Sequence, residues 1–459
     1  MFPPGPRGVI EVARAFRAFS ENPARQMLAV SERYGGTAAF RLGSESVIFL
    51  GEPELIGEVL LDKDAVFIKD RITRGLSIIV GQGLLTSEGE LWKRQRRLIA
   101  PSLTKKHIAT YADAMVRASR EYAASVRHGE VRDVHVDMAK ATLEIVLDTL
   151  FGTGLDGGHE HVAELIDDLM ADFQEVIQSW RRLFPQWVPF AARRRSKDNA
   201  KELDRIVTDL VRKRRASGAL GDDLLSRLLA ARDESDPTRG MDDQQLRDEL
   251  ITLFLAGHET TANALCWTLL LLAEHPEVDA RLFAEVQRVI GDRPATLEDL
   301  PALTYTDAVL KESMRVYPPA HIIGREATRE IKLGRWTIPA HASVLISPWA
   351  LHHDRRFFED PEAFRPERWL DGSTANLPKN VFLPFGGGPR ICVGNHFAMM
   401  EAVLVLATVA QRLRFERINR DTVDVQPAIT LRPKGGISLR ARVRAERAES
   451  VRNARVAAH

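Results

Sequence analysis

The chain has 459 residues, a formal net charge of +1, 44% apolar residues and 28% charged residues. This is the composition of a globular protein with ample core material, and it gives no global attraction to nucleic acid. Two cysteines, Cys266 and Cys392, disfavour a disulfide framework and suit a reducing cytoplasm, and no apolar run is long enough to span a membrane.

The first half of the chain is predicted to hold one hairpin followed by helices. Residues 37–51 are rich in β-branched and aromatic residues around Gly43-Ser44, which indicates two short strands. A short basic helix is expected at 90–99, ending near Pro101. Amphipathic patterns predict further helices at 105–128, 137–151, 160–180 and 196–216, with polar loops at 217–223 and 233–240.

The second half begins with a long helix, capped near Asp242-Asp243 and ending before Pro276. The later elements are expected to be helices at 277–290 and 304–316, strands at 321–348, a loop-rich segment at 354–390, a helix from Gly394 to about Leu413, and paired strands at 423–440. We therefore predict a mainly α fold with small segregated β-sheets. It forms a single domain over residues 1–459, with 441–459 as a frayed or disordered tail.

A glycine-rich loop precedes Cys392, and a predicted helix follows it, in the segment PFGGGPRICVGNH at 384–396. A thiolate at a helix N-terminus is stabilised by the free N–H groups there, so we expect a lowered thiol pKa. The glycines 386–388 would let a flat ligand lie against bare backbone, and Arg390 adds a cation. A buried structural cysteine remains open on these residues alone, whereas zinc lacks a second ligand pair.

The hexapeptide AGHETT at 256–261 interrupts the apolar long helix. A helical glycine costs about 1 kcal/mol against alanine, and a carboxylate among leucines costs free energy unless it is paired. The threonines can bond carbonyls one turn back. Together these residues predict a local opening of the helix beside Glu259 and Thr260, although a solvated glutamate and a packing glycine remain the alternative.

The spacing Phe385-x-x-Gly388-x-Arg390-x-Cys392-x-Gly394 resembles the haem-binding loop of the cytochrome P-450 superfamily, the haem-thiolate monooxygenases. The resemblance covers nearly the whole chain and is to the soluble bacterial type. It implies a cytochrome P-450 fold whose long helix crosses the haem, with Cys392 as axial thiolate ligand of haem b. The other cofactor-binding residues would be Trp92, Arg96, Ala256, Gly257, Arg325, Phe385, Gly386, Arg390 and Gly394.

The same resemblance assigns roles on the long helix and below the haem. Thr260 would contact dioxygen, Glu259 would connect to a proton supply, and His258 would point away. Glu312-x-x-Arg315 would be joined by Arg368 of the segment FRPERW in a buried charge network. The network would serve folding and haem retention rather than catalysis.

The substrate pocket is assigned by position within the resemblance, and core packing explains most of its residues equally well. They are Ile72, Leu76, Ile79, Val80, Leu253, Phe254, Ala320, His321, Ile322, Ile323, Ile429 and Thr430. Most are apolar, so an apolar small molecule such as a terpene, a polyketide or a fatty-acid-like compound is favoured. His321 and Thr430 could be polar anchors.

Electrons would come from a separate ferredoxin or flavodoxin with its NAD(P)H reductase, since the sequence carries no flavin or iron–sulfur motif. Lys93, Arg94, Arg97 and Arg390 could form a basic docking patch, or a solvated helix face. The expected protein is a cytoplasmic monomer that inserts one oxygen atom of dioxygen into its substrate. The alternatives are a peroxide-using haem-thiolate enzyme and a haem sensor or carrier without turnover.

Overall fold

The computed structural model describes residues 1–6, 8–42, 45–62, 64–152, 161–162, 164–165, 168–172, 191–218, 221–233, 240–419 and 421–444. Its helices are α1 (Gly8–Glu21), α2 (Pro23–Tyr34), α3 (Pro53–Leu61), α4 (Arg71–Gly75), α5 (Ser77–Val80), α6 (Gly89–Ile99), α7 (Lys105–Ile108), α8 (Ala112–Ser125), α9 (Val134–Phe151), α11 (Ala191–Ser217), α12 (Leu224–Ala230), α13 (Asp243–Glu274), α14 (Pro276–Val289), α15 (Thr304–Val316), α16 (Pro348–His352) and α17 (Asn395–Arg412). Its strands are β1 (Thr37–Leu42), β2 (Glu45–Leu50), β3 (Phe67–Lys69), β4 (Val131–Asp133), β5 (Ile323–Ala327), β6 (Ile331–Leu333), β7 (Trp336–Ile338), β8 (Ser343–Ile346), β9 (Leu413–Arg417), β10 (Val425–Pro427), β11 (Leu431–Pro433) and β12 (Ser438–Val443).

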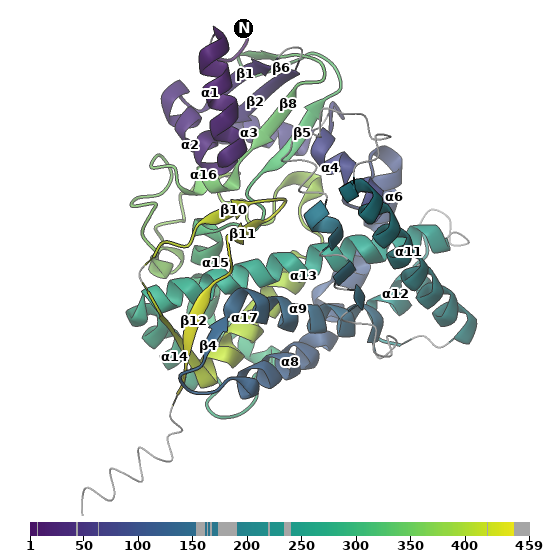
Figure 1. The fold of residues 1–459 in the computed structure, drawn as a ribbon, viewed down its shortest axis with the longest axis vertical. Coiled ribbons are helices and arrows are strands. Elements are labelled where there is room, and N and C mark those ends of the chain that lie inside the picture. The colour runs from purple at the N-terminus through teal and green to yellow at the C-terminus, as the bar shows by residue number, and fades with distance from the viewer. Residues whose placement is uncertain are drawn as a thin grey trace, which may run out of the picture.

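Helix α13 crosses the middle of the molecule and separates two regions (Figure 1). The Asp242 side chain caps it by accepting the Gln245 N–H, and the helix ends before Pro276, as predicted. Helices α8, α9 and α17 pack below it, and the largest hydrophobic cluster lies among these helices. The mainly α fold with small separate sheets is confirmed.

The largest sheet lies on the other side of α13 and has the strand order β1-β2-β8-β5-β3. The predicted hairpin is confirmed, with β1 and β2 antiparallel from Thr37 opposite Leu50 to Leu42 opposite Glu45. Strand β8 pairs parallel to β2 and antiparallel to β5. The sheet thus joins the N-terminal segment to the chain that follows α15.

The C-terminal strands connect the chain end to the helical region. Strand β12 pairs with β9 and β4, and β10 pairs with β11 in a separate two-stranded sheet. The strand continues through Val443, three residues into the expected tail, and residues 445–459 lie outside the described part of the chain. In that described part no helix is both long and apolar enough to cross a membrane.

Several boundaries differ from the sequence-based expectation. The predicted helix 105–128 is broken into α7, a 3₁₀ turn at Ala109–Tyr111 and α8; Tyr111 donates its hydroxyl to the Asp222 carbonyl at 3.1 Å. Helices α1, α2 and α3 were not predicted, although Asn22-Pro23 at the start of α2 is a helix-start signal. Most of the helix predicted at 160–180 and of the loop predicted at 233–240 lies outside the described residues.

Candidate active site

Cys392 lies just before α17 and is held there by its backbone. Its N–H donates to the Phe385 carbonyl at 3.0 Å, and its sulfur receives the backbone N–H of Gly394. The side chain is exposed, yet enough protein surrounds the sulfur that burial raises the pKa of the thiol. Both observations hold when the residue is open to solvent on one side and the sulfur is surrounded by protein on the others.

The direction of this pKa shift corrects our expectation. The Gly394 N–H and the charge of Arg96 lower the thiol pKa, but burial outweighs both, so the pKa lies above its usual range. Helix-end stabilisation is therefore present but insufficient to ionise the thiol. A positive metal centre at the sulfur would supply the missing stabilisation of the thiolate.

The glycines of the loop allow close packing against α3. A Cβ on Gly388 would lie 2.1 Å from the Leu60 carbonyl oxygen, and one on Gly387 would lie 3.0 Å from the Leu60 side chain. Gly386 and Gly388 also have φ of 71° and 65°, the left-handed region that favours glycine. The loop is thus pressed against α3, which fixes the position of Cys392.

Four cations gather beside the cysteine loop: Lys69, Arg96, Arg325 and Arg390. Burial, aided by the charges of Arg325 and Arg390, lowers the pKa of Lys69 to about 7. Burial also lowers the pKa of Arg390 to about 10, with Glu88 opposing and Arg325 and Arg96 adding to the shift. The carboxylates of Glu88, Asp62 and Asp70 oppose these shifts but do not outweigh burial, so bound carboxylates would further stabilise the charged forms of the cations. Lys69 was missed because nothing in the local sequence of β3 separates it from a surface lysine.

Trp92 and Arg96 lie one turn apart on α6, as predicted. The Arg390 guanidinium stacks 4.0 Å from the centre of the Trp92 ring, and the Arg96 guanidinium donates to the Ile391 carbonyl at 2.8 Å. These contacts join the basic helix directly to the cysteine loop. Arg325 is buried in β5 and donates to the Gly324 carbonyl at 2.8 Å.

The expected basic docking patch is smaller than predicted. Arg94 turns inward, where it lies 3.2 Å from Asp233 and donates to the Gly240 carbonyl at 2.8 Å. Arg390 is largely buried and pairs with Glu88. Of the four cations predicted for the patch, Lys93 and Arg97 are exposed.

One stripe of α13 is less buried than the rest of the helix. Leu253, Ala256, Gly257 and Thr260 recur at helical spacing, and Ala256 is exposed in the middle of a helix that is otherwise mostly buried. The Thr260 hydroxyl donates to the Ala256 carbonyl at 2.6 Å, but the helix stays continuous, so the predicted opening is not formed. A Cβ on Gly257 would lie 3.3 Å from Val146, so this glycine lets α9 approach.

His258 and Phe254 lie on the other face of α13, as expected for His258. The His258 Nε2 lies 3.1 Å from the Ala139 carbonyl of α9, and its carbonyl accepts the Thr142 hydroxyl at 3.1 Å. The ring of Phe254 is tilted over that of His258, with centroids 6.0 Å apart. Both side chains therefore stabilise the contact between α13 and α9.

Glu259 is buried and paired away from the stripe. Its Oε1 accepts the Thr430 hydroxyl and lies 2.6 Å from the Arg432 Nε. Burial alone would raise the carboxyl pKa, but the hydrogen bond and charge of Arg432 outweigh it, so the pKa of Glu259 lies below its usual range. The Thr430 hydroxyl also accepts from Asn263 at 3.1 Å, so it is engaged here rather than free as a substrate anchor.

The other predicted pocket residues divide by burial. Those within the main hydrophobic core are Leu76, Ile79, Val80 and Phe254. Those that are partly buried are Leu253, Ala320, Ile322, Ile323 and Ile429. Ile72 is 51% exposed on α4, and His321 is buried with no hydrogen-bond partner at Nδ1 among the described residues. The partly buried group contains the side chains best placed to meet a ligand without opening the core.

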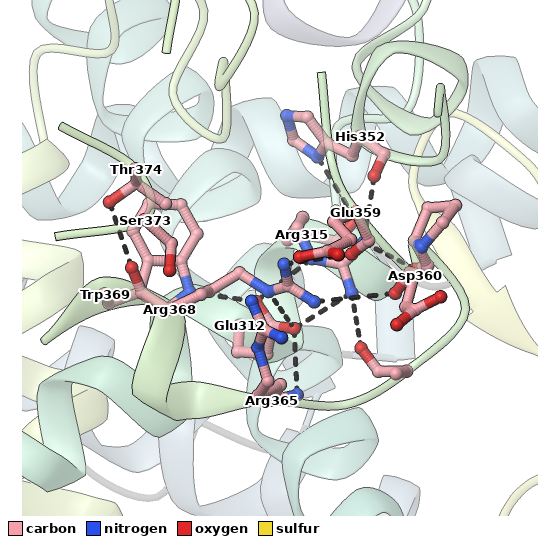
Figure 2. Close-up of polar contacts among 12 residues, drawn as sticks. Glu312, Arg315, His352, Glu359, Asp360, Arg365, Arg368, Trp369, Ser373 and Thr374 are labelled. Carbon is pink, nitrogen blue, oxygen red and sulfur yellow. Dashed lines mark hydrogen bonds and ion pairs between the residues drawn. The ribbon is translucent and has the colours of Figure 1, made fainter. Parts of the chain in front are cut away.

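The predicted charge network is present around Glu312 (Figure 2). The Arg315 Nε lies 3.0 Å from Glu312 Oε2, and the Arg368 Nε lies 2.9 Å from Glu312 Oε1. The carboxylate also accepts the Arg365 backbone N–H and the Trp369 indole N–H, at 3.0 and 2.9 Å. The Arg315 Nη2 also donates to Oε1 at 2.9 Å, so the carboxylate accepts three hydrogen bonds on Oε1 and two on Oε2, and Trp369 is a member that sequence reasoning missed.

Arg315 anchors the network to the loop-rich segment. Its guanidinium donates to the carbonyls of His352, Pro361 and Ala363, at 2.9, 2.6 and 2.9 Å. The loop from α16 to the 3₁₀ turn Pro366–Trp369 thus wraps around one buried arginine (Figure 2). The network stabilises a segment with little regular structure of its own.

Glu401 on α17 is a second buried carboxyl near α13. Neither oxygen has a partner of ordinary hydrogen-bond geometry among the described residues, and burial raises its pKa to about 8, opposed only by the hydroxyl of Thr261. An unfolded chain releases this proton near pH 4.5, whereas the folded chain holds it to about pH 8. The contribution of the Glu401 proton to the free energy of unfolding is therefore present in full below pH 4.5 and is lost as the pH rises to about 8.

Replacing Glu401 by glutamine is expected to remove this loss. The free energy of unfolding of the variant, relative to the unmodified holoprotein, should rise between pH 5 and pH 8, with an upper limit of about 5 kcal/mol. Denaturant midpoints at pH 5, 6.5 and 8 measure it. Glu298→Gln on the surface controls for the lost charge. A difference between variant and unmodified protein that does not change with pH would contradict the assignment.

A single thiol at a helix start, next to a cluster of cations and a glycine loop packed against α3, is the arrangement expected of a haem-thiolate protein. The residues fit the group: an exposed cysteine can ligate iron, and the neighbouring cations suit two propionates. The cytochrome P450 family model matches residues 3–439, and the chain belongs to this family of haem-thiolate monooxygenases. These enzymes use dioxygen and electrons from a redox partner.

Relatives with assigned activities match along most of their length. A Streptomyces melanosporofaciens cyclooctat-9-en-7-ol 5-monooxygenase is 35% identical, covering 87% of this chain and 86% of its own. An Arabidopsis thaliana cytokinin hydroxylase is 34% identical over 89% and 81% of the two chains. A Streptomyces avermitilis pentalenene oxygenase is 32% identical over 87% of each.

Proposed function

We propose that this monooxygenase inserts one oxygen atom into an apolar, terpenoid-like small molecule. The observation that carries the proposal is the stripe of α13, where Leu253, Ala256 and Gly257 present only apolar surface beside a single hydroxyl, that of Thr260. Such a surface favours a substrate with few hydrogen-bonding groups. The names of two Streptomyces relatives, which act on cyclooctat-9-en-7-ol and pentalenene, support the same substrate class.

We assign the cofactor contacts as follows. Cys392 would ligate the iron, and Arg96, Arg325, Arg390 and Lys69, with the Trp92 indole, would hold the propionates. Haem supplies the iron centre at which dioxygen is activated, and the thiolate favours cleavage of the O–O bond. The cation cluster supports this assignment because bound carboxylates would restore the charge balance of Lys69 and Arg390.

We assign proton transfer to the side chains of Thr260 and Glu259. The Thr260 hydroxyl, on the less buried stripe, holds a proton at Oγ1 and passes it to the reacting oxygen. Glu259, the next residue in the sequence, is the carboxylate that replaces this proton; its side chain is buried and paired with Arg432. Positioned proton donors of this kind accelerate reactions by about 10²–10⁴-fold.

Electron supply is assigned to a separate ferredoxin or flavodoxin with its NAD(P)H reductase. Two cysteines in the sequence cannot hold a four-cysteine cluster. The exposed Lys93 and Arg97 on α6 lie on the helix that contacts the cysteine loop through Arg96. An acidic partner bound there would reach the cofactor over a short path.

Thr260→Ala is expected to lower the yield of oxygenated product per electron pair by about tenfold or more, with peroxide released instead, because the last proton donor is lost. The test uses surrogate ferredoxin, reductase and NADPH with a panel of terpene hydrocarbons, fatty acids and polyketides. Labelled dioxygen should place one oxygen atom in the product.

Thr268→Ala is the matched control, since Thr268 lies two turns further along α13 and donates to the Ala264 carbonyl at 2.6 Å, as Thr260 does to Ala256. It should keep the yield of the unmodified enzyme. The absence of any oxygenated product across the panel, with normal haem reduction, would contradict the proposed function. Equal product from hydrogen peroxide alone would instead favour the peroxide-using alternative.

A further inference from the structure

A chain of hydrogen bonds runs from His135, at the start of α9, to the buried Glu259. The His135 Nε2 lies 3.2 Å from Asn263 Oδ1, and Asn263 Nδ2 donates to Thr430 Oγ1 at 3.1 Å. The Thr430 hydroxyl then donates to Glu259 Oε1. His135 is half-buried and Asn263 fully buried, so the chain leads from a partly accessible side chain at the start of α9 to Glu259, the sequence neighbour of Thr260 on α13.

The direction of each bond in this chain follows from the charge at its inner end. Glu259 is held as a carboxylate by Arg432, so it only accepts, and Thr430 must donate to it. With its hydrogen used, Thr430 must accept from the Asn263 amide nitrogen. The Asn263 carbonyl oxygen therefore faces His135, and the ring must carry a hydrogen on Nε2.

The other properties of His135 agree with that tautomer. Burial, and then the charge of Arg432, lower the pKa of His135, which favours a neutral ring with one N–H. Its backbone N–H bonds Asp133 Oδ1 at 3.0 Å, so the residue is fixed at the helix start. A histidine present only to pack at the start of α9 would need no particular tautomer.

The two oxygens of the Glu259 carboxylate differ in their hydrogen bonds. Both hydrogen bonds that Glu259 receives from the described residues end on Oε1. We propose that His135 is a positioning residue: through Asn263 and Thr430 it holds Glu259 by Oε1 and so leaves Oε2 to exchange protons with Thr260. The inference rests on the proposed function for the use of Oε2. The amide of Asn263 does not pass protons, so His135 orients Glu259 rather than feeding it.

The tautomer of His135 is a test that needs no turnover. We expect ¹⁵N NMR of the reduced, carbon-monoxide-bound holoenzyme at pH 7 to show the hydrogen on Nε2, with the signal assigned by its absence in His135→Gln. In Thr430→Val the link to Glu259 is broken, and a mixture of tautomers is expected. A hydrogen on Nδ1 in the unmodified enzyme would overturn the proposal.

A second measurement separates positioning from packing. NADPH oxidation with surrogate ferredoxin and reductase, without substrate, divides between peroxide, which uses two electrons and two protons, and water, which uses four of each. His135→Leu removes the donor and should raise the peroxide fraction several-fold. His135→Gln keeps an N–H in place of Nε2 and should restore most of the original partition.

Val136→Ala, an exposed neighbour on α9, is the control and should leave the peroxide fraction unchanged. Equal peroxide fractions in His135→Leu and His135→Gln would overturn the inference. The proposed function fails differently, through absence of oxygenated product in the unmodified enzyme. The two failures are therefore distinguishable.

Discussion

Replacing Cys392 by alanine should abolish both the thiolate-type spectrum of the reduced carbon monoxide complex and all turnover. Its thiol lies just before the start of α17, and the hydrogen bond from the Gly394 N–H holds the sulfur at the end of the glycine loop. A methyl group there can neither ligate iron nor donate electron density to it. Absorption spectra of the reduced, carbon-monoxide-treated protein measure the change.

Cys266→Ala is the matched control for this change. Cys266 is fully buried on α13, and burial raises its thiol pKa well above the usual range, so it is an inert core side chain. Its variant should retain the thiolate-type spectrum, with a modest loss of stability from the lost sulfur. Survival of that spectrum in Cys392→Ala, or its disappearance in Cys266→Ala, would refute the ligand assignment.

The parts of the site carried by local sequence patterns could be predicted. The loop before Cys392, the long helix with AGHETT, and the Glu312-x-x-Arg315 pair each place their residues within a few turns of chain, so spacing alone orders them. The cap at Asp242 and the stop before Pro276 fixed the limits of α13 in the same way. The arginine that completes the network, Arg368, came from resemblance, because spacing does not reveal a partner 53 residues beyond Arg315.

The parts that depend on contacts distant in sequence could not be predicted. Lys69 reaches the cation cluster through the pairing of β3 with β5, and Arg432 reaches Glu259 through the β10–β11 pair. Neither carries a local signal of its position. The sign of the Cys392 pKa shift also depends on how much protein surrounds the sulfur. The burial of a side chain depends on contacts from the whole fold, so the direction of such a pKa shift is set only once the fold is formed.

Glu312→Ala is expected to cost about 3–5 kcal/mol in the free energy of unfolding, since it leaves two buried arginines without their counterion. Arg315 and Arg368 are 0% and 2% exposed at their side chains, so neither can turn to water without disturbing the loop around it. Trp369 would lose its acceptor as well. Denaturant unfolding and the fraction of haem retained after purification measure the effect.

The matched control lies five residues earlier on the same helix. Asp307 pairs with Lys311 at 2.6 Å, but their side chains are 36% and 40% exposed, so Asp307→Ala should cost under about 1 kcal/mol. The two pairs are similar in distance and differ mainly in burial. A cost for Glu312→Ala no larger than that for Asp307→Ala would show that the loop-rich segment is held by its other contacts.

Glu312→Gln separates the charge from the hydrogen bonds at this position. The Arg365 and Trp369 N–H groups bond different oxygens of Glu312, so a glutamine keeps an acceptor for one of them, offers an N–H in place of the other oxygen and carries no negative charge. If charge is what the arginines need, this variant should lie near Glu312→Ala in stability; if hydrogen bonds suffice, it should lie near the unmodified protein. Because two guanidinium groups share one carboxylate and form no other ion pair within the described part of the chain, we expect the first result.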